Sequence, residues 1–234
     1  MSDSIQFPVS EIFTSIQGEG NYAGVNALFI RLQYCNLRCI WCDTKFTWTG
    51  KGEYEFYSLE RLKETIHNTS QHHIILTGGE PLLHPIDLLS VPNKKIHIES
   101  NGYYIPTEDL NTNLSDGSSI KRKAMKEENI ANYNWVISPK LSNSRQPLNK
   151  EALKYWADKD FVTFKFIVRH NDDFSEITEL VQQLKIKTHK VYLGLEGTEP
   201  KSQLNTNFVQ KIIDAGFNFS PRLHVLFWGN ERKK

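Results

Sequence analysis

Cysteine is scarce in this sequence: the 234 residues include only three, and all three lie between positions 35 and 42. So few cysteines, placed so close together, exclude a fold held together by several disulfides. No apolar run approaches the ~18 residues that a membrane-spanning helix needs. The start, MSDSIQFPVSEIF, has no basic segment followed by an apolar one, so no signal peptide is expected. These absences predict a cytoplasmic protein, in a reducing compartment and without a membrane partner.

An excess of charge of either sign is also missing. The 28 basic and 27 acidic residues leave a formal net charge of +1, so no global field draws the chain to nucleic acid or to an anionic membrane. A tRNA-binding protein is disfavoured, because it would concentrate basic residues on one face. The length predicts one domain over residues 1–234 with a substantial core.

Strand and helix patterns alternate along most of the chain. The expected strands are 9–16, 26–34, 73–76, 95–99, 134–138, 161–168, 191–195 and 223–227, and the expected helices are 58–67, 149–157, 172–185 and 203–215. Such alternation predicts an α/β fold with a parallel sheet and crossover helices. About six units are too few to close an eight-fold barrel. We therefore expect an open, partial (β/α)6 TIM-like barrel, with residues 1–25 as an N-terminal extension.

Residues 106–132 depart from this pattern, because they are polar, charged and rich in turn-forming residues. Their composition predicts a solvated insertion. The basic run at 121–123 (KRK) is an alternative docking site for an acidic electron-transfer partner.

The cysteines have the spacing C-x3-C-x2-C, in the segment CNLRCIWC at 35–42. Three thiolates on one short loop are suited to three irons of a [4Fe-4S] cluster, which leaves the fourth iron without a protein ligand. Structural zinc would need a fourth ligand, and no fourth cysteine exists, although folding could bring in a histidine. Free thiols and a disulfide remain alternatives.

Three further motifs, TGGEP at 77–81, ESNG at 99–102 and SPK at 138–140, each follow an expected strand. Loops at the carboxyl ends of parallel strands share one face, where folds of this class place their active sites. Paired glycines allow close approach of a ligand, and the carboxylate of Glu80 suits an ammonium group. Each motif alone is also typical of an ordinary turn.

The cysteine motif with an aromatic residue before its last cysteine, followed by GGE, resembles the radical S-adenosylmethionine (radical SAM) enzymes. The resemblance implies a [4Fe-4S] cluster on Cys35, Cys39 and Cys42, with the amino and carboxylate groups of S-adenosylmethionine on the open iron. It also implies a radical SAM type of barrel. The implied S-adenosylmethionine contacts are Trp41, Cys42, Asp43, Gly78, Gly79, Glu80, Ser100, Ser138, Pro139, Lys140 and Glu196.

The segments FTSIQGEG, FIRLQYCNLRCIWCDTKFTW and SPRLHVLFWGN are similar to those of the 7-carboxy-7-deazaguanine synthases, a radical SAM family of queuosine biosynthesis. This resemblance implies that 6-carboxy-5,6,7,8-tetrahydropterin is converted to 7-carboxy-7-deazaguanine with loss of ammonia. It implies a homodimer, a requirement for Mg²⁺ and an external reductant such as flavodoxin or ferredoxin. The implied substrate contacts are Ile16, Gln17, Gly18, Arg31 and Thr77, and the implied magnesium ligand is Thr44.

These roles suit the residue types. Arg31 offers a planar fork for a substrate carboxylate, with a surface salt bridge as the alternative. The amide of Gln17 matches a pterin's donors and acceptors, whereas Glu19 either holds the turn or touches substrate. Magnesium prefers hard oxygen ligands such as the Thr44 hydroxyl. His224, on the expected last strand, is either a core or interface residue or a site residue.

Two other functions compete with the synthase. One is a different radical SAM enzyme, such as a glycyl-radical activase acting on a partner protein, for which the QGEG segment and Arg31 would have no explanation. The other is a non-enzymatic iron–sulfur electron carrier or cluster-sensing regulator. Such a protein normally has a fourth cluster ligand and needs no GGEP turn.

Overall fold

Each of the two compact units into which the chain divides contains parallel strands. The computed structural model describes residues 5–229 and 231–234. One unit comprises Met1–Ser15, Asn26–Ser100 and Tyr104–Asn134, and the other comprises Ile16–Val25, Asn101–Tyr103 and Trp135–Lys234.

The main sheet of the first unit has the strand order β5-β4-β2-β1-β3. Their bounds are Lys95–Ser100 for β5, His73–Gly78 for β4, Asn26–Leu32 for β2, Gln6–Ile16 for β1 and Glu55–Ser58 for β3. β2, β4 and β5 pair in parallel, whereas β3 pairs antiparallel with β1. Helix α1, Leu59–Asn68, begins as expected at Ser58, whose hydroxyl accepts from the Arg61 amide.

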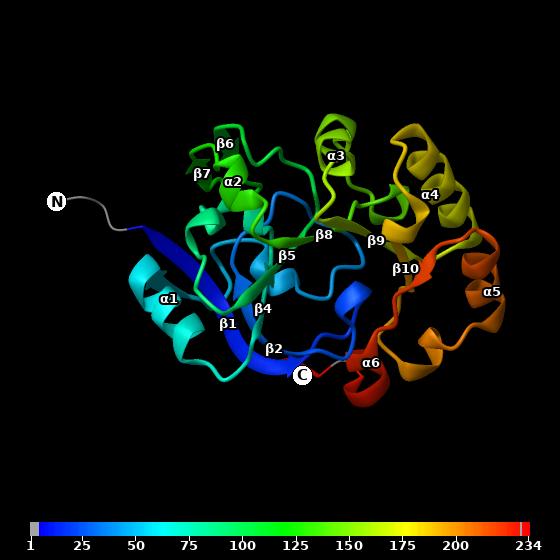
Figure 1. The fold of residues 1–234 in the computed structure, drawn as a ribbon, viewed down its shortest axis with the longest axis horizontal. Coiled ribbons are helices and arrows are strands. Elements are labelled where there is room, and N and C mark those ends of the chain that lie inside the picture. Colours follow the sequence, from blue (N-terminus) through cyan, green and yellow to red (C-terminus); the bar gives the residue numbers. More distant parts are fainter. Residues whose placement is uncertain (1–4, 230) are drawn as a thin grey trace. The chain divides into compact units, whose positions relative to one another are not determined.

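The second unit contains β11-β10-β9-β8, all paired in parallel. The bounds are β8 Asn134–Ile137, β9 Val162–Val168, β10 Val191–Leu195 and β11 Asn218–Phe219. Between successive strands lie α3 (Lys150–Ala157), α4 (Asn171–Gln183) and α5 (Thr206–Asp214), which flank one side of this sheet (Figure 1). The expected alternation of strands and crossover helices is therefore present here.

Apolar runs make the cores of both units. Strand β4 carries Ile74, Ile75 and Leu76 in succession, and none of the three has exposed surface. A parallel strand covered on both faces favours such a continuous run over strict alternation. In the second unit the rings of Trp135 and Trp156 pack with their centroids 4.6 Å apart, and both are buried.

The expected last strand, 223–227, is wrong: these residues form helix α6, Leu223–Trp228, and the short β11 takes the final place in the sheet. An apolar run as short as LHVLF has no periodicity that separates a strand from a buried helical turn. Gly229, at φ 62°, follows the helix in a conformation that favours glycine. His224 therefore lies on a helix, and Asn230, the end of the SPRLHVLFWGN motif, lies outside the described residues.

The inserted segment is not simply solvated, as its composition predicted. It forms a hairpin of β6 (Leu110–Asn113) and β7 (Ser119–Arg122), followed by the short helix α2 (Glu127–Ile130). Figure 1 shows these elements close together. Leu114, Met125 and Ile130 are buried, and so is Arg122 from the middle of the basic run, at 4% exposure. A side chain so buried cannot dock an acidic partner, which leaves only the two lysines of that run on the surface.

Among the helices of residues 5–229 and 231–234, none combines the length and the apolar character that crossing a bilayer requires.

The buried tryptophan pair yields a stability prediction. Replacing Trp156 by alanine removes a fully buried ring beside Trp135, and large-to-small changes of this kind cost about 3–5 kcal/mol. Urea unfolding followed by circular dichroism should show that loss for Trp156→Ala. Lys154→Ala, an exposed change on the same helix, should stay within about 0.5 kcal/mol of the parent. Equal stability of the two variants would contradict this account of the core.

Candidate active site

The three cysteines lie on the loop that follows β2, in the first unit. None of the three forms a disulfide, and Cys39 is buried while the other two are half-buried. The Leu37 amide donates to the Cys35 sulfur at 3.4 Å, and the Cys42 sulfur lies 3.5 Å from the Thr44 hydroxyl. Burial raises the pKa of the Cys35 thiol, and nearby anionic groups, Glu80 among them, raise it further. A thiolate at this position therefore requires a compensating positive charge, which bound iron supplies.

Gln33, at the end of the β2 run, anchors the loop. Its side chain is fully buried, and its amide nitrogen donates to the carbonyls of Phe46, at 2.9 Å, and of Thr49. The Gln33 carbonyl accepts a 2.8 Å hydrogen bond from His84, whose pKa is lowered by burial to about 4, so that the ring is neutral near pH 7. We did not identify Gln33 from the sequence, although a polar residue closing an apolar strand is a signal of this kind.

The paired glycines after β4 pack directly on the start of the cysteine loop. A Cβ atom on Gly79 would lie 1.9 Å from the Tyr34 carbonyl oxygen, and one on Gly78 would lie 2.2 Å from that of Leu32. The Gly79 amide donates to the Leu32 carbonyl at 3.0 Å, and the Glu80 amide donates to that of Tyr34 at 2.7 Å. Only glycine allows two backbones to come this close. The two predicted cofactor motifs therefore form one continuous surface.

Glu80 has no exposed surface. Its Oε1 atom accepts from the Leu82 amide at 2.8 Å and from the Ser100 hydroxyl at 2.7 Å. Two of the predicted S-adenosylmethionine contacts, Glu80 and Ser100, thus touch each other. A carboxylate held in this way beside the cysteine loop is a strong acceptor for an ammonium group, because charge-assisted hydrogen bonds strengthen away from water. Of the other predicted contacts on the loop, Trp41 is half-buried and Asp43 is exposed.

Two predicted substrate contacts, Arg31 and Thr77, are paired across the parallel strands β2 and β4. The Arg31 Nε atom is 2.9 Å from the Glu11 carboxylate, with the side chains 17% and 1% exposed. Arg31 therefore forms a salt bridge, as the alternative prediction had it, but this ion pair is largely buried rather than on the surface. The guanidinium also lies 5.9 Å from the centre of the Phe13 ring. These contacts fix the direction of the fork.

The donor set fits an iron–sulfur cluster. Each cysteine of a [4Fe-4S] cluster binds a different iron, so the sulfurs need not crowd together as the ligands of one ion do. Within the part of the chain that the structure describes, no three His, Cys, Asp or Glu side chains gather closely enough to hold a single metal ion. Hydrogen bonds to the sulfurs, such as that from Leu37, are a usual feature of cluster sites.

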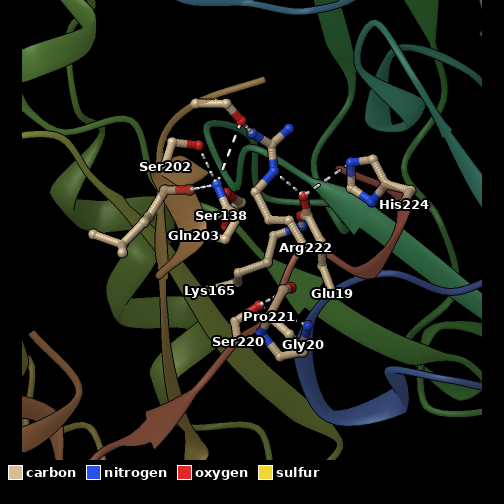
Figure 2. Close-up of polar contacts among 12 residues, drawn as sticks. Glu19, Gly20, Ser138, Lys165, Ser202, Gln203, Ser220, Pro221, Arg222 and His224 are labelled. Carbon is tan, nitrogen blue, oxygen red and sulfur yellow. Dashed lines mark hydrogen bonds and ion pairs between the residues drawn. The ribbon is translucent and has the colours of Figure 1, made fainter. Parts of the chain in front are cut away.

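A second polar centre lies in the second unit, around the QGEG turn (Figure 2). The Glu19 carboxylate is 2.8 Å from Arg222 Nε and forms a further ion pair with Lys165, and His224 Nε2 lies 3.9 Å away. Burial by itself raises the pKa of the Glu19 carboxyl group. Lys165 and Arg222, with a smaller contribution from His224, outweigh that effect and hold the pKa well below its usual range. Glu19 is therefore an anion that holds its turn in place.

The same centre joins two sequence motifs that lie some 200 residues apart. The Gly20 amide donates to the Ser220 hydroxyl at 2.8 Å, and the Leu223 amide donates to the Gly18 carbonyl at 3.0 Å. A Cβ atom on Gly18 would lie 2.2 Å from the His224 ring. QGEG and SPRLH therefore form a single structure. The sequence did not single out Lys165 or Arg222, although a lysine inside the strand VTFKFIV is an unusual feature that points to a buried ion pair.

The remaining predicted residues also lie in the second unit. Lys140 donates to the Ser138 hydroxyl at 3.0 Å, and both Ser138 and Pro139 are buried. Glu196 pairs with Arg169 at 3.6 Å. Gln17 is buried, and its side-chain oxygen accepts from the Glu19 amide at 3.2 Å, while Ile16 ends β1 half-buried.

Comparison with known proteins first defines the class. The model of the Radical SAM superfamily matches residues 29–118. The crystal structure of QueE from Escherichia coli is 26% identical and has a TM-score of 0.68, covering 92% of this chain and 93% of that one. SuiB of Streptococcus suis, solved with the precursor peptide SuiA, shares the fold at 14% identity and a TM-score of 0.50, covering 80% of this chain and 46% of that one. The protein is a radical SAM enzyme, and the predicted radical SAM fold class is confirmed.

The particular family follows from relatives that match almost from end to end. The 7-carboxy-7-deazaguanine synthase of Pyrobaculum aerophilum is 31% identical over 100% of both chains. That of Hyperthermus butylicus is 33% identical over 93% of this chain and 91% of its own, and that of Rhodopirellula baltica is 30% identical over 96% and 87%. The chain belongs to the 7-carboxy-7-deazaguanine synthase family.

The contact between the glycine pair and the cysteine loop can be tested by Gly79→Ala. Because the added Cβ would meet backbone atoms of Tyr34 at 1.9 and 2.4 Å, we expect the two loops to separate. Overpacking of this kind costs about 1–3 kcal/mol or more. The reconstituted variant should bind less iron and unfold at lower urea than the parent. Gly24→Ala, where the added Cβ meets nothing within 4 Å but the φ of 90° strains an alanine, should also lose stability and yet keep its iron content. Full iron binding by Gly79→Ala would contradict the prediction.

The ion pairs of Glu19 predict a pH-dependent stability. Glu19→Gln leaves Lys165 and Arg222 without their buried anion, and breaking such a pair costs about 3–5 kcal/mol. The carboxylate's contribution is fully present above its ordinary pKa of 4.5 and is lost as the pH falls towards the lowered folded value. The difference in unfolding free energy between parent and variant should therefore be largest near pH 7 and shrink below about pH 4.5. A constant difference from pH 7 to pH 3 would contradict this assignment.

Proposed function

We propose that this protein converts 6-carboxy-5,6,7,8-tetrahydropterin to 7-carboxy-7-deazaguanine with release of ammonia, in queuosine biosynthesis. The product is that named for its full-length relatives. The observation that carries the proposal is the direct backbone contact between the cysteine loop and the GGE turn. That contact joins the two motifs of a radical SAM site in a chain of this family.

Cys35, Cys39 and Cys42 would hold the [4Fe-4S] cluster, and the GGE turn would hold S-adenosylmethionine beside it. When bound, the two groups supply the one-electron chemistry that starts the reaction. The protein's part is to bind, to orient and to exclude water. The buried Glu80 carboxylate accepts the amino group of S-adenosylmethionine, and the Ser100 hydroxyl holds that carboxylate in place. In the second unit, Lys140 and Ser138 offer a cation and a hydroxyl to the cofactor's carboxylate and ribose.

The substrate contacts follow the same logic. Arg31 is aimed by Glu11 and Phe13 and offers its planar fork to the pterin carboxylate. Thr77, its neighbour on β4, adds a hydroxyl. The amide of Gln17 and the backbone of Ile16 and Gly18 offer donors and acceptors to the pterin ring.

Thr44 is the proposed magnesium ligand. Its hydroxyl lies 3.5 Å from the Cys42 sulfur, and therefore at the edge of the cluster loop. Magnesium keeps several water or substrate oxygens in its shell, so a single protein oxygen is a sufficient anchor. An ion bound there would supply positive charge that offsets the charge of the substrate carboxylate.

Further parts of the proposal concern the working state of the enzyme. We propose a homodimer in the cytoplasm that receives electrons from an external reductant such as flavodoxin or ferredoxin. The near-neutral net charge of +1 does not favour nucleic acid as a partner.

The competing functions have less support. A glycyl-radical activase leaves the linked QGEG and SPRLH segments without a role. An electron carrier has no need of the glycine pair that closes on the cysteine loop. Relatives that match nearly the whole chain share the synthase name.

The decisive experiment is an anaerobic incubation of the reconstituted protein with S-adenosylmethionine, reductant, Mg²⁺ and the carboxytetrahydropterin. We expect 7-carboxy-7-deazaguanine and one equivalent of ammonia per product, both absent when the pterin is omitted. If 5′-deoxyadenosine forms slowly with or without the pterin and no deazaguanine appears, the substrate assignment is wrong.

Thr44→Ala tests the magnesium ligand. Losing the hydroxyl should weaken the dependence of the rate on Mg²⁺, because the ion then has no protein oxygen at this position. We expect the activity at saturating Mg²⁺ to fall by about tenfold or more, in the range found when one catalytic electrostatic contact is lost. Thr49→Ala, on the same loop but further from the cysteines, is the matched control. A Thr44→Ala enzyme that keeps the parent's full Mg²⁺ dependence would remove Thr44 from the metal site.

A further inference from the structure

The proposed function assigns no role to the hairpin of β6 and β7. It belongs to the first unit, with Leu110 opposite Arg122 and Asn113 opposite Ser119. A tight turn closes it, in which Gly117 has φ 87°. Its two ends make contacts of different kinds, and both contacts reach loops of the candidate active site.

At one end, Arg122 is buried against the GGEP loop. Its Nε atom donates to the Leu82 carbonyl at 2.8 Å, and its Nη1 atom donates to the carbonyls of Pro106, at 2.9 Å, and Lys123, at 2.7 Å. Burial lowers the pKa of this guanidinium, but Asp87, Asp109 and Glu80 counter that effect. An arginine side chain stays charged in proteins, so these are charge-assisted hydrogen bonds.

Leu82 is the link from Arg122 to the cofactor site. Its carbonyl accepts from Arg122, and its amide donates to Glu80 Oε1 at 2.8 Å. The Ser100 hydroxyl holds the same oxygen from the other side. A shift of Leu82 therefore moves one of the hydrogen bonds that set the direction of the Glu80 carboxylate.

At the other end, Asp116 reaches the segment that follows the cysteines. Its Oδ2 atom accepts from the Gly50 amide at 2.9 Å, and its Oδ1 atom accepts from the Ser118 amide at 3.0 Å, within the hairpin turn. Gly50 directly follows Thr49, whose carbonyl is held by Gln33. The hairpin thus touches both loops that the proposed function assigns to the cofactors.

We propose that residues 104–125 form a brace that sets the geometry of the cofactor site, and that Arg122 is a positioning residue for Glu80. The brace aligns the GGE turn with the cysteine loop through Arg122 and Asp116, without contacting the cofactor. The proposal rests on the proposed function in assigning S-adenosylmethionine to the GGE turn. Its consequence is that Arg122 controls the affinity for S-adenosylmethionine rather than the rate at saturation.

Binding of S-adenosylmethionine to the reconstituted protein is the first test, by anaerobic equilibrium dialysis. Arg122→Met keeps the length of the stem and removes every donor, so we expect the Kd to rise by about tenfold or more, the usual weight of a charge-assisted hydrogen bond. The KM for S-adenosylmethionine should rise in parallel, with kcat at saturation within about threefold of the parent. Arg122→Lys, which restores the charge and a single donor nitrogen, should recover part of the affinity. Lys121→Met and Lys123→Met, exposed neighbours in the same run, should leave both constants unchanged.

Hydrogen exchange of the protein without cofactors is the second test. Arg122→Met should speed amide exchange at residues 79–84, while amides of β9, in the other unit, exchange as in the parent. Asp116→Asn should speed exchange near Gly50 and leave residues 79–84 nearly unchanged. Unaltered exchange at 79–84 together with unaltered affinity would overturn the proposal. A uniform loss of protection in both units, with KM unchanged and kcat reduced, would reduce Arg122 to a general stabilising role.

The outcome of this test is separable from that of the proposed function. If the parent binds S-adenosylmethionine but makes no deazaguanine, the substrate assignment falls, and the affinity of Arg122→Met still decides the role of the brace. If the parent does not bind S-adenosylmethionine, the assignment of the GGE turn falls with the cofactor part of the proposal, and the exchange data decide whether Arg122 orders that turn. If Arg122→Met does not fold, Arg122→Lys takes its place in both measurements.

Discussion

The structure of the candidate site depends on one close backbone contact, that of Gly79 with Tyr34 and Cys35. Two strand ends that are distant in the sequence meet there with no side chain between them, and two hydrogen bonds hold them together. The meeting of β2 and β4 sets the positions of the buried Glu80 and of the three cysteines. It also sets the register that pairs Arg31 with Thr77. A side chain at position 79 would push the GGE turn away from the cysteine loop. It would do so without altering any of the residues that are proposed to bind the cofactors.

The second unit is organised by charge rather than by close approach. Glu19 is largely removed from water, and such an anion is stable only because Lys165 and Arg222 surround it. The same residues fix the turn that carries Gln17 and the helix that carries His224. A flexible loop binds its ligand more weakly, because ordering the loop on binding costs free energy. The ion pairs of Glu19 hold the turn that carries Gln17 in one conformation before any ligand binds.

Much of this arrangement was predictable from the sequence. The cysteine spacing and the glycine pair singled out two loops that the structure brings into contact, and a serine cap located α1, because each depends on local chemistry. The last helix was not predictable, since LHVLF has no distinguishing period. The burial of Arg122 inside a polar segment was not predictable either. Its partners are backbone carbonyls, which every residue type has and which composition therefore does not reveal. Gln33, Lys165 and Arg222 act through residues far away in the chain, and a sequence read locally does not show such partners.

The ion pair between Glu19 and Arg222 closes a loop of 203 residues. Contacts between such distant parts of a chain slow folding, because the intervening chain must be ordered before the contact forms. During synthesis Glu19 is made 203 residues before Arg222, so the acidic turn remains without one of its cations while the intervening chain is added. A chain that stops before Arg222 therefore lacks the arginine that holds the Glu19 turn in place.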